Sequence, residues 1–150
     1  LRMVVAQKDI VCTPYRVKTN DPKVIRYTTT VPDNDNVKVL PGGLVELTRG
    51  PSGMMLIHRR VFETLQKNRP DLEIQAHQHV DLFPEGVKIF SFWDCVFKDG
   101  KWTGDDIAFC NLATENGFKL YANIESEMVH HGGYGYKGRF GDGLISKNEK

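Results

Sequence analysis

The stretch Thr103-Gly104-Asp105-Asp106-Ile107-Ala108-Phe109-Cys110 is the segment of this chain that says most about its fold. A glycine and two carboxylates precede apolar residues at helical spacing, which predicts a helix from near Asp105 to Glu115. Asn116-Gly117 is a typical left-handed stop for such a helix. Adjacent carboxylates repel each other, which raises the proton affinity of one of them and favours a general base. The pair can equally serve as a simple cap that complements the helix dipole.

Strands and a second helix are predicted on both sides of this segment. Apolar, β-branched or alternating runs predict strands over residues 9–12, 23–30, 44–47, 118–121 and 127–130. Residues 54–57 are a short apolar run, and the aromatic residues 89–97 predict a strand or an extended buried segment. Apolar spacing predicts a helix over residues 58–67, which Pro70 ends. The first six residues resemble the end of a further amphipathic helix. This alternation predicts one α/β domain over residues 1–150, a mixed β-sheet with flanking helices, and a flexible tail at 139–150.

Composition narrows the function classes. The chain has 150 residues, of which 40% are hydrophobic and 26% charged, as expected for one soluble globular domain. A net charge of +1 argues against a dedicated nucleic-acid binder. We find no apolar run near the ~20 residues of a membrane span and no signal peptide, so a cytoplasmic location is expected. Cys12, Cys95 and Cys110 are too scattered for a disulfide framework and are predicted as buried free thiols.

Two further clusters could contribute chemistry. His130-His131-Gly132-Gly133-Tyr134-Gly135-Tyr136 combines imidazoles, which suit a divalent metal or a phosphate, with glycines that let the backbone approach a ligand. The alternative is a histidine pair in a surface loop. Gly50-Pro51-Ser52-Gly53 is a glycine-bounded turn between a strand and the next apolar run. Such turns often hold a substrate at a sheet edge, and they also simply turn a corner.

Taken in order, these elements resemble the second half of GT-A-type glycosyltransferases, in particular inverting, family-2-like enzymes of bacteria and viruses. The matching segments are Gly53, Met55-Leu56-Ile57-His58-Arg59-Arg60-Val61-Phe62, Phe92-Trp93-Asp94, 104–110, Gly117-Phe118-Lys119-Leu120-Tyr121 and 130–136. The resemblance extends from Leu1 to about Gly138. It implies a partial GT-A-like fold, that of nucleotide-diphospho-sugar transferases. It also implies transfer of a sugar from a nucleotide-sugar to an acceptor hydroxyl with inversion.

The resemblance implies roles for individual residues. Asp106 matches the general base that deprotonates the acceptor, and Asp105 replaces a glutamate of the family as an acceptor contact or support. His130 matches the histidine that approaches the metal or the nucleotide diphosphate. The implied substrate-binding residues are Gly50, Ser52, Gly53, Trp93, Asp94 and Tyr134. Tyr134 could stack on a sugar face, whereas core packing is the stronger expectation for Trp93.

The resemblance implies Mn²⁺ or Mg²⁺ for the complete enzyme, held by an Asp-x-Asp motif just before a helix and strand like those at the start of this chain. Asp33-Asn34-Asp35 has the letters of that motif, but it follows the first strand in a polar loop, and we interpret it as unrelated. Leu1 is not an initiator methionine. We therefore expect that the natural protein begins earlier or that the chain was trimmed, and that most of the donor site lies outside it.

Two other functions stay open. His77-Gln78-His79 places two imidazoles on one face of a strand, half of a metal site that His130 or His131 with Asp105 could complete in a hydrolase. A non-catalytic carbohydrate- or protein-binding module is the second alternative. The expected partners are a nucleotide-sugar and a glycan, lipid or protein acceptor, without nucleic acid. An open sheet edge also allows a homo-oligomer.

Overall fold

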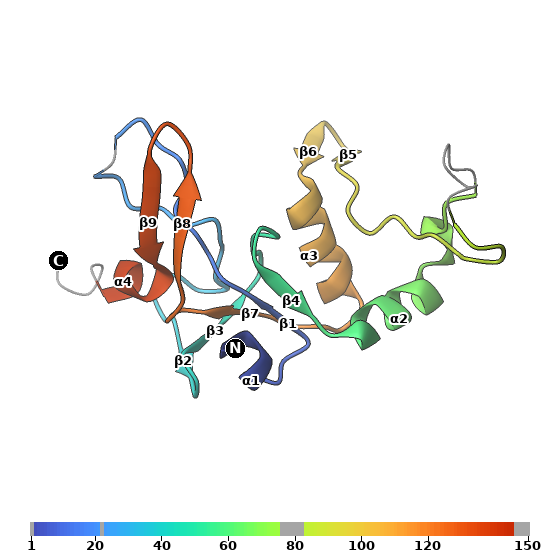
Figure 1. Ribbon diagram of the computed structural model, residues 1–150, viewed down its shortest axis with the longest axis horizontal. Helices are drawn as coiled ribbons and strands as arrows, with labels where there is room; N and C mark the ends of the chain where they lie inside the picture. The colour runs from blue at the N-terminus through green and yellow to red at the C-terminus, as the bar shows by residue number, and fades with distance from the viewer. Residues whose placement is uncertain (1, 22, 76–82, 146–150) are drawn as a thin grey trace.

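The computed structural model describes residues 2–21, 23–75 and 83–145 of the chain (Figure 1). Its centre is a five-stranded sheet with the order β2-β3-β7-β1-β4, so that β2 and β4 are the outer strands. The strands are β1 (Ile10–Cys12), β2 (Val39–Leu40), β3 (Leu44–Leu47), β4 (Met55–Ile57) and β7 (Leu120–Asn123). β1 and β7 are parallel, whereas β3 pairs antiparallel with β7 and β4 antiparallel with β1. The predicted class, α/β with a mixed sheet, is confirmed.

The two faces of the sheet are covered by different helices, because alternate residues of a strand point to opposite sides. One face packs against α2 (Arg59–Asn68) and α3 (Asp105–Glu115) and carries Ile10, Cys12, Val45, Leu47, Leu120 and Ala122. The other face carries Val11, Leu44 and Tyr121, which pack with Met3 of α1 (Arg2–Val5) and with Ala6. Figure 1 shows α1 and α3 on opposite sides of the sheet.

Helices α2 and α3 supply much of the core. Val61 and Leu65 of α2 are buried, as are Phe109, Cys110, Leu112 and Ala113 of α3. Full burial of each large apolar side chain contributes roughly 1.5–3 kcal/mol. The predicted bounds of α3 are confirmed, and Gly117 beyond its end adopts a φ of 86°. α2 lies one residue later than predicted.

Two hairpins and a short helix surround this core. β5 (Val96–Lys98) pairs with β6 (Lys101–Thr103), and β8 (Glu127–His131) pairs with β9 (Gly135–Arg139). α4 (Phe140–Ile145) follows β9, and a 3₁₀ turn, η1 (Pro70–Leu72), follows α2. Figure 1 shows β5 and β6 beyond the N-terminal end of α3. Within the described ranges, no helix has the length and apolar character needed to cross a bilayer.

Several predicted elements differ from the structure. Residues 23–30 form no strand and contribute only the isolated bridges Arg16↔Tyr27 and Thr30↔Arg49. Residues 89–97 contribute one bridge, Glu73↔Phe90, and the start of β5. Residues 23–26 and 94–97 are exposed, so these segments lack the buried face that a sheet strand needs. Residues 139–145, part of the predicted tail, form the end of β9 and α4, with Phe140 buried in the core.

Candidate functional site

The carboxylate pair lies in the first turn of α3, after Gly104 at the N-cap position. The Asp105 residue is exposed and Asp106 is half-buried. The Asp106 Oδ1 atom accepts a hydrogen bond of 2.8 Å from the backbone N–H of Ile107. Because the first N–H groups of a helix have no partner within it, this turn attracts negative charge. The Asp106 carboxylate therefore uses one oxygen to cap the helix, and its second oxygen can face a ligand.

Cys110 fixes the position of α3 against the loop of residues 50–53. Its Sγ atom lies 3.4 Å from both the backbone nitrogen and the carbonyl oxygen of Gly50. The Gly50 N–H donates to the sulfur, and the thiol donates to the Gly50 carbonyl. Residues four apart share one face of a helix, so Asp106 lies one turn above Cys110 on the same side. This contact therefore brings the Asp106 carboxylate toward the loop.

The glycines of this loop allow close contacts that a side chain would block. Gly50 and Pro51 are buried, whereas Ser52 and Gly53 are exposed. A Cβ atom on Gly50 would lie 2.7 Å from the Cys12 sulfur. A Cβ atom on Gly53 would lie 2.9 Å from the ring and the hydroxyl oxygen of Tyr15. The loop therefore rests directly on residues at and after the end of β1.

Tyr15 connects the separate parts of the site. Its ring packs edge-on against His130, with ring centroids 4.6 Å apart, and its hydroxyl lies against Gly53. Burial raises the pKa of the Tyr15 hydroxyl above its ordinary value of 10.0, and the negative charge of Asp106 raises it further. The hydroxyl therefore stays protonated at neutral pH and can donate a hydrogen bond near the carboxylate. Gly53 and His130, which come from two distant segments, both contact this tyrosine, and the charge of Asp106 acts on its hydroxyl.

His130 is held in a defined orientation on β8. Its Nδ1 atom lies 2.8 Å from the backbone oxygen of Arg16. A carbonyl oxygen can only accept, so the proton is on Nδ1 and the lone pair of the neutral ring is on Nε2. Histidines that bind metals commonly use this arrangement, with a backbone carbonyl fixing the ring. Nε2 is therefore the nitrogen that is available to a metal ion.

Trp93, Asp94 and Tyr134 lie in other surroundings. The Trp93 ring stacks on Phe109 at 4.0 Å between centroids, which is a core contact beside the middle of α3. Asp94 accepts a hydrogen bond from the Ser91 hydroxyl and lines a cleft of about 560 Å³ along α3. Tyr134, at the β8–β9 turn, packs on Tyr136 with ring centroids 4.3 Å apart and is 45% exposed.

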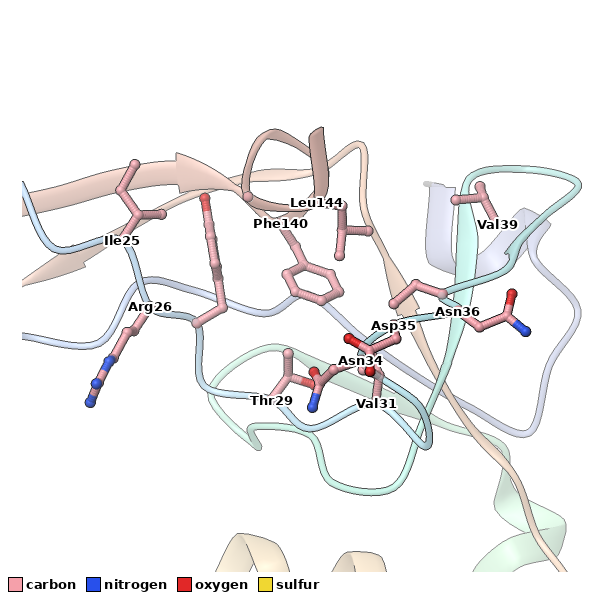
Figure 2. A pocket seen from close by; sticks show the side chains of 13 residues that line it. Ile25, Arg26, Thr29, Val31, Asn34, Asp35, Asn36, Val39, Phe140 and Leu144 are labelled. Carbon is pink, nitrogen blue, oxygen red and sulfur yellow. The ribbon is translucent and has the colours of Figure 1, made fainter. Parts of the chain in front are cut away.

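The Asp-x-Asp tripeptide lies elsewhere. The backbone N–H of Asp35 donates to the Asp33 carboxylate, which shapes the polar loop. Asp35 lines a separate cleft of about 690 Å³, into which the Phe140 side chain points from α4 (Figure 2). Among residues 2–21, 23–75 and 83–145, no three His, Cys, Asp or Glu side chains form a metal-binding group. His77 and His79 of the alternative metal site lie outside the described residues.

Comparison of the chain with protein-family models, curated proteins and solved structures gives no match. The function is therefore inferred from the site residues themselves. Sequence reasoning missed Tyr15, although one signal pointed to it. Thr13-Pro14-Tyr15 follows the carboxyl end of the buried strand β1, and ligands of open α/β sheets bind outside such strand ends.

Proposed function

We propose that this chain is the acceptor-side part of an inverting glycosyltransferase with a GT-A-like arrangement. It would transfer a sugar from a nucleotide-sugar to an acceptor hydroxyl, with Asp106 as the general base. The observation that carries the proposal is the group around Tyr15. There a glycine loop and an oriented imidazole contact one tyrosine, and the charge of a helix-terminal carboxylate acts on its hydroxyl. The order of motifs along the chain supports the same assignment.

The proposed reaction is a single displacement. The Asp106 carboxylate takes the proton of the acceptor hydroxyl as the hydroxyl oxygen forms a bond to the anomeric carbon. The bond from that carbon to the diphosphate oxygen breaks, and its electron pair leaves with the nucleoside diphosphate. Attack from the side opposite the leaving group inverts the anomeric centre. Charge develops on the diphosphate, so donors near it stabilise the transition state.

Tyr15 and His130 suit supporting roles in this step. The protonated Tyr15 hydroxyl can donate a hydrogen bond to a substrate oxygen near Asp106. Neutral His130 can bind an ion through Nε2, and once Nε2 carries a proton it can donate to a phosphate oxygen. Mn²⁺ or Mg²⁺, when bound, supplies positive charge to the leaving group. His130 fits such an ion as a single ligand, and the described residues hold no group of three ligands.

The test is the Asp106→Asn variant in the intact protein, assayed with UDP- and GDP-sugars in the presence of Mn²⁺. The amide keeps the size of the side chain but cannot take the proton. We expect transfer to fall by a factor of roughly 10²–10⁴. Binding of the nucleotide-sugar should change little, because the base contacts the acceptor. Release of the nucleoside diphosphate and calorimetric donor binding measure the two effects.

The matched control is Asp105→Asn, which removes the neighbouring charge from the same helical turn. Asp105 is exposed, so its loss should reduce transfer much less than loss of Asp106. Wild-type turnover by Asp106→Asn would contradict the assignment of the base. Saccharide binding that ignores both nucleotide-sugar and Mn²⁺, without any transfer, would favour the non-catalytic binding module.

A further inference from the structure

The β5–β6 hairpin presents two aromatic rings side by side. Asp99 and Gly100 have φ angles of 52° and 72°, the two positive values of a type I′ turn. This turn pairs Phe97 directly with Trp102 across the hairpin. Directly paired residues project from the same face of a two-stranded ribbon. The hairpin therefore holds the two rings as one surface.

The two faces of this hairpin have different environments. The face with Val96, Lys98, Lys101 and Thr103 lines the cleft along α3 that also contains Asp94. Phe97 and Trp102 lie on the opposite face and are 74% and 69% exposed. The cleft along α3 thus accounts for the first face only. A large aromatic pair that stays in solvent contributes little to folding, which favours a role in contact with a ligand.

The exposed surface is continuous with the candidate site. A methyl group placed on Gly104 would lie 3.4 Å from the outer edge of the Trp102 indole and 3.6 Å from Asp106 Oδ1. The indole and the carboxylate therefore flank a single point at the start of α3. Gly104 leaves that point free of side-chain atoms. A ligand resting on Trp102 would have its edge within reach of the proposed base.

We infer that Phe97 and Trp102 form a saccharide-binding surface that holds the acceptor sugar beside Asp106. A pyranose ring has an apolar face of C–H groups, which packs on an indole, and a rim of hydroxyls, which donate to carboxylates. An aromatic surface that borders the paired carboxylates Asp105 and Asp106 matches both parts of that ligand. The inference rests on the proposed function for the identity of the sugar as an acceptor.

The test is a titration of the intact protein with methyl β-D-glucopyranoside, methyl β-D-galactopyranoside and methyl α-D-mannopyranoside. Saturation-transfer NMR detects the binding of each glycoside. We expect at least one of the three to bind, and Trp102→Ala to weaken that binding about tenfold. Trp102→Phe keeps an aromatic face and should retain most of the affinity. Val39→Ala, at a β2 residue that is 56% exposed, is the control for nonspecific surface effects. Circular dichroism checks that each variant is folded.

The outcomes separate this inference from the proposed function. If a nucleotide-sugar is turned over, Trp102→Ala should raise the acceptor KM about tenfold and leave kcat nearly unchanged, unlike Asp106→Asn. Unchanged glycoside affinity in Trp102→Ala and Phe97→Ala would overturn the inference and leave the proposed function intact. Absence of glycoside binding by the wild type would also overturn it. Self-association that Trp102→Ala abolishes would assign the surface to a protein contact instead.

Discussion

Gly50 lies where the two buried thiols of the site approach each other. Its backbone contacts the Cys110 sulfur, and its missing side chain leaves room for the Cys12 sulfur. Since all three residues are buried, none can move away without disturbing the core. The position of the loop beside Tyr15 thus depends on one residue having no Cβ atom.

Gly50→Ala should therefore destabilise the protein. The new methyl group would lie 2.7 Å from Cys12 Sγ and 3.3 Å from Leu47 Cδ1, both in the core. Overpacking of this kind costs about 1–3 kcal/mol. Urea denaturation measures the loss in the free energy of unfolding. Gly133→Ala is the matched control, because its methyl group meets nothing within 4 Å. Equal stability of the two variants would show that the loop can shift freely.

At the residue scale, the sequence predicted positions more readily than contacts. Asp106 was placed correctly in the first turn of α3, because capping residues depend only on local sequence. The contact of Tyr15 with Gly53 and His130 joins segments that are far apart in the chain. No local pattern encodes such a contact. The packing of Trp93, in contrast, could be predicted, because its apolar neighbours in the sequence indicated a core contact such as the one with Phe109.

At the scale of elements, strong periodicity predicted the structure and weak periodicity did not. Helix α3 and strands β3 and β8 were predicted nearly to the residue, because buried apolar spacing set their limits. The β5–β6 hairpin was missed, although Asp99-Gly100 between alternating residues is a strong hairpin signal. The aromatic residues before it led to one long predicted strand or extended buried segment, whereas Phe90 forms one isolated bridge and a strand begins only at Val96.

The turn of this hairpin can be tested separately from its aromatic rings. Gly100→Ala introduces a side chain at a φ of 72°, which should cost about 1–2 kcal/mol of local stability. The new methyl group meets no atom within 4 Å, so backbone strain is the only cause. We expect weaker nuclear Overhauser contacts between Phe97 and Trp102. Asp99→Asn is the control, since asparagine tolerates the same backbone region, and an equal loss there would contradict the turn assignment.

At the scale of the whole molecule, the three cysteines report on the core. The structure places Cys12 and Cys110 in the interior and leaves Cys95 exposed, so the prediction of buried thiols holds for two of the three. Burial raises the pKa of Cys12 to about 12 and also raises that of Cys110. At neutral pH, dithiobis(nitrobenzoate) should react with one thiol per folded chain and with all three after unfolding. Cys95→Ser should remove the fast reaction, and rapid reaction of two thiols would contradict the fold.

The same burial predicts a loss of stability in alkali. The Cys12 pKa is raised from an ordinary value of 9.0 to about 12, so the folded state favours the neutral thiol. This contribution is fully present below pH 9.0 and is lost as the pH rises toward 12. Urea denaturation across this range should show falling stability. Cys12→Ala should show a shallower decline, and an identical pH dependence would mean that other groups dominate.

The outer strand β4 limits which additional strand could pair with the edge of the sheet. Its register with β1 sets Met55 opposite Cys12 and Ile57 opposite Ile10, so these side chains face the α2–α3 layer. An incoming peptide that hydrogen-bonds along the far side of β4 would extend the sheet and its apolar face only if its own apolar residues alternate in step with Met55 and Ile57. A slip of one residue would turn its polar side chains inward. The free edge of β4 therefore favours peptides whose apolar residues fall at every second position in the matching register.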